Sequence, residues 1–243
     1  MRNMLAIAAA VVSDAVRRKV LYLIGVFAAI LAVMIPQLPT YGAGVVAGVF
    51  REISLALVFA ASLALVLSLA ANRVPAEVER RTVYNVLSKH VRRWEYIAGT
   101  WLGISAVMAI AVGAFIAVTQ GIGAARYHEP MWQLWQGGLG IWLEMSALAA
   151  FAVGVSAVTG PVVVVTAALA FLFAAHSREA LVGTAPTGIA AFYPSFDTFN
   201  VISPVAHGGG VSPAYMLVML GVFAAWAGVL LLAASAVFST RDL

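Results

Sequence analysis

Six long runs of apolar residues constrain the fold of this chain more than any other feature of its sequence. A helix rises about 1.5 Å per residue, so roughly 20 residues cross the ~30 Å hydrocarbon layer of a bilayer. The runs are continuously apolar and do not alternate, which favours membrane helices over the strands of a barrel. The shortest run starts at Pro161, a residue tolerated at the first position of a helix. The runs are Val20–Leu38, Ile53–Ala71, Ile97–Thr119, Leu139–Val158, Pro161–His176 and Ala214–Phe238.

The low charge content of the chain indicates that these helices face lipid. Of its 243 residues, 63% are hydrophobic and only 10% are charged, whereas about a quarter of the residues of a soluble domain are charged. We therefore predict an all-α integral membrane protein with six transmembrane helices, forming a single domain over residues 1–243. The chain has no cysteine, which excludes disulfides and thiolate ligands. Outside one short segment, residues 72–96, it also lacks the basic patch expected of a protein that binds nucleic acid.

The positions of the basic residues predict the orientation of the helices. If the N-terminus is cytoplasmic, only Arg51, Arg126 and Arg178 of the 14 lysines and arginines lie outside. Cytoplasmic loops of membrane proteins carry an excess of lysine and arginine, so this orientation is favoured. We expect a multi-pass protein of the inner (cytoplasmic) membrane with both termini in the cytoplasm.

Three segments outside the spans have distinct compositions. Residues 1–19 have a weakly amphipathic pattern, which favours an interfacial helix over a cleaved signal peptide. Residues 72–96 form a charged cytoplasmic segment, and residues 177–213 form a long outer loop rich in proline, glycine and aromatic residues. Between the fourth and fifth runs, the sequence Thr-Gly-Pro at 159–161 is compatible with a tight helical hairpin or with one long broken helix.

The cytoplasmic segment Asn72–Tyr96 carries the most informative pattern. Pro75, with Glu77 and Glu79 close behind it, is typical of a helix start. The pattern predicts a short amphipathic helix or helix pair, which would pack on lipid headgroups or on a cytoplasmic partner protein. The alternative is a solvated loop whose arginines only set the topology. The apolar residues at helical spacing are Val83, Leu87, Val91 and Trp94.

This segment resembles the first cytoplasmic loop of the type-2 ABC permeases, a family of six-span exporter subunits. The family pattern has two acidic residues, then Thr, a Leu-Leu-Ser-like run and a basic stretch leading into the next span. The chain is similar in particular to the branch that contains the permease of the nitrous oxide reductase maturation system, although Arg81 and His90 replace a common Gly and Pro. The residues that carry the resemblance are Glu77, Glu79, Thr82, Val86-Leu87-Ser88, Val91-Arg92-Arg93 and Gly99, with Tyr193–Asn200 in the last outer loop.

The resemblance implies a partner and a division of labour. In this family the loop holds a coupling helix that docks on a soluble ABC ATPase, present in two copies beside two permease chains of the same or different sequence. ATP and Mg²⁺ would bind to the ATPase, and the outer loop would form short re-entrant helices. The residues expected to contact the ATPase are Glu77, Glu79, Arg80, Arg81, Thr82 and Leu87.

Motifs for chemistry within this chain are missing from the sequence. Lys19 and Lys89 are its two lysines, and neither belongs to a phosphate-binding loop. There is no His-Glu-x-x-His motif. We therefore expect no catalytic residues, cofactor or metal site in the chain itself, and regard it as a permease and not an enzyme.

Glu144 is the notable charge within a predicted span, about two turns from its outer end. A charge inside a bilayer is costly and is a functional hypothesis by default. Glu144 is thus expected to be either a charge of the transport pathway or a structural charge paired with Arg126 or Arg178. The alternative functions are a membrane-embedded enzyme, which would need polar companions for Glu144, and a non-transport assembly subunit of a membrane complex.

Overall fold

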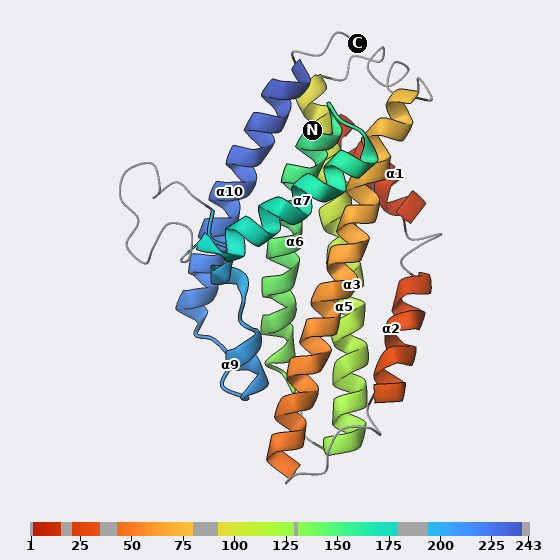
Figure 1. Cartoon of the computed structure of the whole chain (residues 1–243). Coiled ribbons are helices and arrows are strands. Elements are labelled where there is room, and N and C mark those ends of the chain that lie inside the picture. The colour runs from red at the N-terminus through yellow and green to blue at the C-terminus, as the bar shows by residue number, and fades with distance from the viewer. Residues whose placement is uncertain are drawn as a thin grey trace.

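The computed structural model describes residues 2–15, 21–34, 43–79, 92–128, 131–178 and 194–239. These residues form an elongated helical bundle, and no strand occurs among them (Figure 1). The elements in chain order are α1 (Arg2–Ala15), α2 (Leu21–Met34), α3 (Ala43–Glu79), α5 (Arg93–Tyr127), α6 (Leu134–Ser156), α7 (Pro161–His176), the 3-10 helix η4 (Asp197–Phe199), α9 (Ile202–Ala206) and α10 (Pro213–Ser239).

Four of the described helices, α3, α5, α6 and α10, are long and apolar enough to cross a membrane. This confirms a multi-pass helical membrane protein. The other two predicted spans correspond to α2, with 14 described residues, and α7, with 16. Both are apolar but shorter than the roughly 20 residues of a full crossing. A total of six spans therefore stays a prediction.

The central helix is α6, which packs against α3, α5, α7 and α10. The most apolar stretch of α6 is 72% buried, whereas that of α10 is only 11% buried and lies at the periphery. Small residues such as Gly137 and Gly138 let Leu55 of α3 and Ile116 of α5 approach the backbone of α6. Helix packing in lipid depends on this kind of close approach, because burial of apolar groups supplies little driving force there.

Two tryptophans join α5 and α6 reciprocally. The Trp101 indole of α5 donates a hydrogen bond of 2.8 Å to the Ser146 carbonyl of α6. The Trp142 indole of α6 donates one of 2.9 Å to the Ser105 carbonyl of α5. Both indoles also lie beside the ring of Phe223 on α10, at centroid distances of 6.4 and 6.2 Å. The three helices are thus held in a defined relative register.

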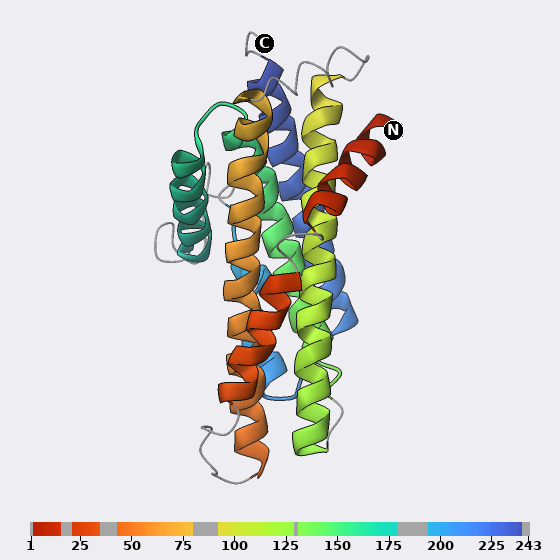
Figure 2. The same ribbon diagram turned by 90° about the vertical axis from the view of Figure 1, so that its right-hand side faces the viewer.

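Helix α1 packs along the first half of α5 (Figure 2). A side-chain carbon placed on Gly99 or Gly103 of α5 would meet Ile7 or Val11 of α1 at 3.0 Å or less. The absence of side chains at these two positions is what allows the helices to touch. The helix predicted within residues 1–19 therefore exists, while its place at a membrane interface stays a prediction.

The start of α5 and the end of α10 meet at one end of the bundle. The Arg93 guanidinium donates hydrogen bonds to the Phe238 and Ser239 carbonyls, at 3.2 and 2.8 Å. Tyr96 stacks on Phe238 with a centroid distance of 5.8 Å. The C-terminal end of α3, which stops at Glu79, lies at this same end (Figures 1 and 2).

The segment 72–96 differs from its prediction in one respect. Pro75 does not begin a separate helix, because α3 runs without a break from the membrane-spanning part to Glu79. Glu77 and Glu79 therefore belong to the last turn of α3, and α5 begins at Arg93. Arg80, Arg81, Thr82 and Leu87 lie outside the described residues. The coupling helix stays a prediction.

At the opposite end, α9 is tied to α3, and the segment after α9 is tied to α6. The Arg51 guanidinium of α3 donates to the Ala206 carbonyl at 3.2 Å. The Gln136 amide of α6 both accepts from the Val211 N–H, at 2.8 Å, and donates to the Val211 carbonyl, at 3.2 Å. The predicted outer loop 177–213 thus contains η4 and α9 packed onto the bundle, and its re-entrant character stays a prediction.

Candidate functional site

The hairpin formed by α6 and α7 brings Glu144 and His176 together. Helix α6 ends at Ser156, and α7 begins at Pro161, which occupies its first turn behind the extended residue Gly160. Proline has no N–H to leave unsatisfied there, so the chain can turn sharply and start a new helix. Phe151 of α6 and Phe171 of α7 stack at a centroid distance of 4.2 Å. Of the two predicted alternatives, the structure therefore has the hairpin.

Glu144 lies near the middle of α6, ten residues after Leu134 and twelve before Ser156. It is only 2% exposed. This position is deeper than the sequence suggests, because α6 begins before the apolar run that marks it. A charge at the centre of a membrane helix costs about 2.5–3.5 kcal/mol by insertion measurements. The position therefore needs a compensating partner.

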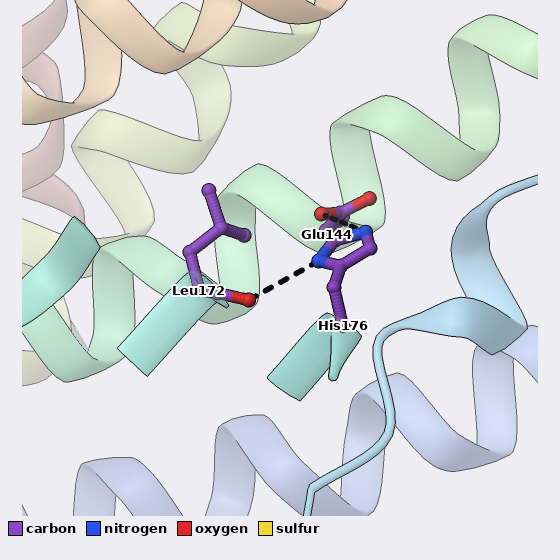
Figure 3. A network of polar contacts seen from close by, with 3 residues as sticks. All are labelled: Glu144, Leu172 and His176. Atoms are coloured by element: carbon purple, nitrogen blue, oxygen red, sulfur yellow. Dashed lines mark hydrogen bonds and ion pairs between the residues drawn. The ribbon is translucent and has the colours of Figure 1, made fainter. Parts of the chain in front are cut away.

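His176, the last residue of α7, is that partner. Its Nε2 lies 3.4 Å from Oε1 of Glu144, and its Nδ1 lies 3.2 Å from the carbonyl oxygen of Leu172 (Figure 3). A carbonyl oxygen can only accept a hydrogen bond, so Nδ1 carries a hydrogen. Nε2 and Oε1 then need one further proton between them. Without this proton, Nε2 and Oε1 would face each other as two acceptors beside an uncompensated negative charge. With two such protons, the pair would carry an uncompensated positive charge.

The pair thus holds one shared proton and is electrically neutral as a unit. The proton can sit on the imidazole, as in an imidazolium–carboxylate pair, or on the carboxyl group. Oε1 of Glu144 is fully buried, and Nε2 of His176 is its one polar neighbour within the described residues. At 3.4 Å, the distance between Nε2 and Oε1 is longer than that of an ordinary N–H···O hydrogen bond, about 2.7–3.2 Å. The carboxylate therefore has unused capacity to bind a donor or a cation.

A cavity of about 530 Å³ opens beside this pair. Its wall is apolar and aromatic apart from Glu144, His176 and Asn200. A volume of this size is within the usual range for small-molecule sites, about 300–1,000 Å³. The lining residues come from α3, α6, α7 and the segment from η4 to α9, and are Phe59, Ile141, Glu144, Leu169, Leu172, Phe173, His176, Phe199, Asn200 and Ile202.

The segment around η4 closes one side of the cavity. The Phe196 N–H donates to the Ala175 carbonyl at 3.2 Å, and the buried Phe196 ring lies edge-on to His176 at 6.4 Å. The carbonyl of Phe199 lies directly against Gly140, one turn before Glu144 on α6. Any side chain at Gly140 would meet this carbonyl, so glycine is required for the segment to reach the cavity.

The lining limits what chemistry the site can perform. It contains no serine, threonine, lysine or arginine among the described residues. Within the same part of the chain, no group of three metal-ligating side chains converges. Asp197 on η4 is a second carboxylate, near enough to act electrostatically on Glu144. The site can therefore bind, hold a proton and attract positive charge, but its described lining offers no hydroxyl or amine nucleophile.

Glu144 was singled out from the sequence, with Arg126 or Arg178 as its partner in one of two alternatives, and His176 was not considered. Within the described residues its charged neighbour is His176 and neither Arg126, which is exposed near the end of α5, nor Arg178. The sequence held a signal for the pair, because Glu144 and His176 lie about 18 and 22 Å from the hairpin turn along their own helices. Two residues at matched distances from a hairpin turn face each other at the same depth.

The comparisons with known proteins leave the family of this chain unassigned. No protein-family model matches it, and no curated protein is similar enough to count as a match.

Proposed function

We propose that this chain is the membrane-spanning permease subunit of an ATP-driven ABC transporter, working as an exporter with a separate ATPase subunit. The observation that carries the proposal is the charged segment between α3 and α5, which resembles the coupling loop of type-2 ABC permeases. The ATPase would bind ATP and Mg²⁺ and would contact Glu77, Glu79, Arg80, Arg81, Thr82 and Leu87.

The lengths of α3 and α5 support this role. They have 37 and 35 residues, which at 1.5 Å per residue correspond to about 56 and 52 Å, well beyond a ~30 Å bilayer core. The unbroken α3 connects Glu79 at one end with Phe59 in the wall of the cavity. A rigid helix moves as a body, so a displacement at the charged end would reach the cavity.

The periphery of the bundle supports association with a second permease copy. Helix α10 is largely exposed along its apolar length, and so is one face of α2, where Tyr22 is 76% and Val33 is 64% exposed. Lipid covers such surfaces in a monomer, and a homodimer or heterodimer would bury part of them.

Co-purification tests the proposal directly. The tagged chain is extracted from its native host in mild detergent, and its partners are identified by mass spectrometry. We expect a soluble ATPase with a phosphate-binding loop to accompany the wild type and to be lost from the Glu77→Lys/Glu79→Lys variant. Glu52→Lys is the matched control, because Glu52 is an exposed carboxylate near the other end of the same helix. A folded wild-type chain that brings down no ATPase contradicts the proposal.

The Glu144–His176 pair favours a second candidate, a membrane-embedded enzyme. A carboxylate and an imidazole that share a proton in an apolar cavity can act as a general acid or base. Because the described lining has no hydroxyl or amine nucleophile, such an enzyme would use the pair to activate water or a hydroxyl group of its substrate. Turnover of a lipid substrate by the purified chain, without ATP and abolished by Glu144→Gln, would establish this candidate instead.

A further inference from the structure

The cavity beside Glu144 combines an apolar, aromatic wall with a single site of charge. Phe59 of α3, Phe173 of α7 and Phe199 of η4 contribute rings to the wall. Aromatic faces attract cations as well as apolar groups. A bound molecule would thus be surrounded by hydrocarbon and would meet one charged group, the Glu144–His176 pair.

The electrostatics of the cavity favour positive charge. His176 on α7 is the one basic group in the described lining, and it already shares its proton with Glu144. The other charged group that acts on Glu144 is Asp197 on η4, which is negative. The residues that α3 and α9 place in the lining, Phe59 and Ile202, carry no charge. Beyond the pair, the Asn200 amide is the one donor that the described lining offers an anion, whereas a cation would meet the buried Oε1 of Glu144, whose contact with Nε2 of His176 is long, at 3.4 Å.

Access to the cavity is from the side of α7 that faces away from the bundle. Phe173, which lines the cavity, is 73% exposed, and Leu169 one turn earlier is 42% exposed. In a membrane this face contacts acyl chains, so the mouth of the cavity opens toward lipid. A molecule that partitions into the bilayer can reach the site without crossing water.

We propose that this cavity binds a hydrophobic organic cation, whose charge replaces the proton shared by Glu144 and His176. Before binding, the pair and its proton are neutral together. On binding, the proton leaves to solvent, His176 becomes a neutral imidazole with its hydrogen on Nδ1, and the Glu144 carboxylate pairs with the cation. Charge is balanced in both states, with no bond formed to the protein. The inference rests on the proposed function only for the claim that such cations are the transported class.

Binding to the purified full chain in detergent tests this proposal without the ATPase. The probe is tetraphenylphosphonium, and the matched control is tetraphenylborate, which has the same four phenyl groups and the opposite charge. We expect tetraphenylphosphonium to bind the wild type and to lose at least tenfold in affinity in Glu144→Gln. Glu52→Gln, which removes an exposed carboxylate of α3, should bind like the wild type.

Proton release decides the matter even if Glu144→Gln fails to fold. In weakly buffered solution with a pH indicator dye, wild-type chain should release about one proton for each cation bound, and the affinity should fall as the pH is lowered. Equal binding of the cation and the anion without proton release would overturn the proposal, as would no binding of the cation. Either result leaves the co-purification test of the ATPase partner unaffected.

Discussion

The imidazole of His176 lies 3.4 Å from the carboxylate of Glu144 and joins the end of α7 to the middle of α6. Because both groups are embedded among apolar side chains, each would be costly without the other. The same contact closes the α6–α7 hairpin and supplies the charge of the cavity. The packing of the α6–α7 hairpin and the proposed binding of a cation therefore depend on the same pair of residues.

A double-mutant cycle measures this pair. We expect His176→Ala to destabilise the chain because it leaves Glu144 without its proton-sharing partner, and to have a smaller effect when Glu144→Gln is already present. The coupling energy should be about 1–2 kcal/mol, near the upper end for polar contacts in membrane proteins. Reversible unfolding in mixed micelles gives the four free energies. The exposed residues Glu52 of α3 and Ser239 of α10, at opposite ends of the bundle, form the control cycle, which should be additive. Additive effects at Glu144 and His176 would mean that they do not interact.

Gly140 should tolerate no side chain. In Gly140→Ala the new methyl group meets the Phe199 carbonyl, so η4 must move away from α6 and the free energy of unfolding should fall by about 1–3 kcal/mol. Gly113→Ala on α5 is the matched change, because nothing lies within 4 Å of its new methyl group. It should be neutral or stabilising, by up to about 1 kcal/mol, since alanine favours a helix. Equal unfolding temperatures for the two variants would show that the segment does not approach Gly140.

The reciprocal tryptophan bonds should each contribute to the register of α5 and α6. Trp101→Phe and Trp142→Phe keep an aromatic ring beside Phe223 but remove the indole donor to a backbone carbonyl. We expect each to lower the free energy of unfolding by about 0.5–1.5 kcal/mol. Trp132→Phe is the control, because Trp132 is 67% exposed. A loss as large at Trp132 would point to a general effect of removing tryptophan.

The absence of cysteine makes the orientation directly measurable. Single cysteines at exposed Arg92 and Ser239 report on one end of the bundle, and single cysteines at exposed Arg126 and His207 report on the other. With an impermeant maleimide, we expect Arg92→Cys and Ser239→Cys to react only from the cytoplasmic side, and Arg126→Cys and His207→Cys only from outside. Labelling of Arg92→Cys and Ser239→Cys from opposite sides would contradict an even number of membrane crossings between these two residues.

Hydropathy was sufficient to predict which parts of the chain form long helices, but not where those helices end. The run Ile53–Ala71 lies within α3, yet α3 continues for two more turns through Pro75 to Glu79. Charge ends a lipid-facing stretch without ending a helix, because helix continuation depends on backbone hydrogen bonds. In contrast, α7 has the predicted bounds, since Gly160 and Pro161 set its start through backbone geometry.

The candidate site could be predicted only in part, for a related reason. Glu144 is conspicuous because a charge in an apolar run is costly wherever the helix lies. His176 ends an apolar run, where a histidine is unremarkable, and its role emerges only once α7 folds back on α6. Gly140 is likewise one glycine among 21 until the Phe199 carbonyl is seen against it. Spacing puts both residues at similar distances from the hairpin turn, but packing decides whether they meet.

The proposed function requires that an ATPase on another chain moves the spans of this chain through the segment after α3. The most direct measurement is ATP hydrolysis by the complex purified from the native host through a tag on this chain and reconstituted in lipid nanodiscs. We expect vanadate-sensitive hydrolysis that is retained in Glu52→Lys and lost in Glu77→Lys/Glu79→Lys. Intact, folded wild-type chain without ATPase activity, or activity that survives the double charge reversal, would contradict it.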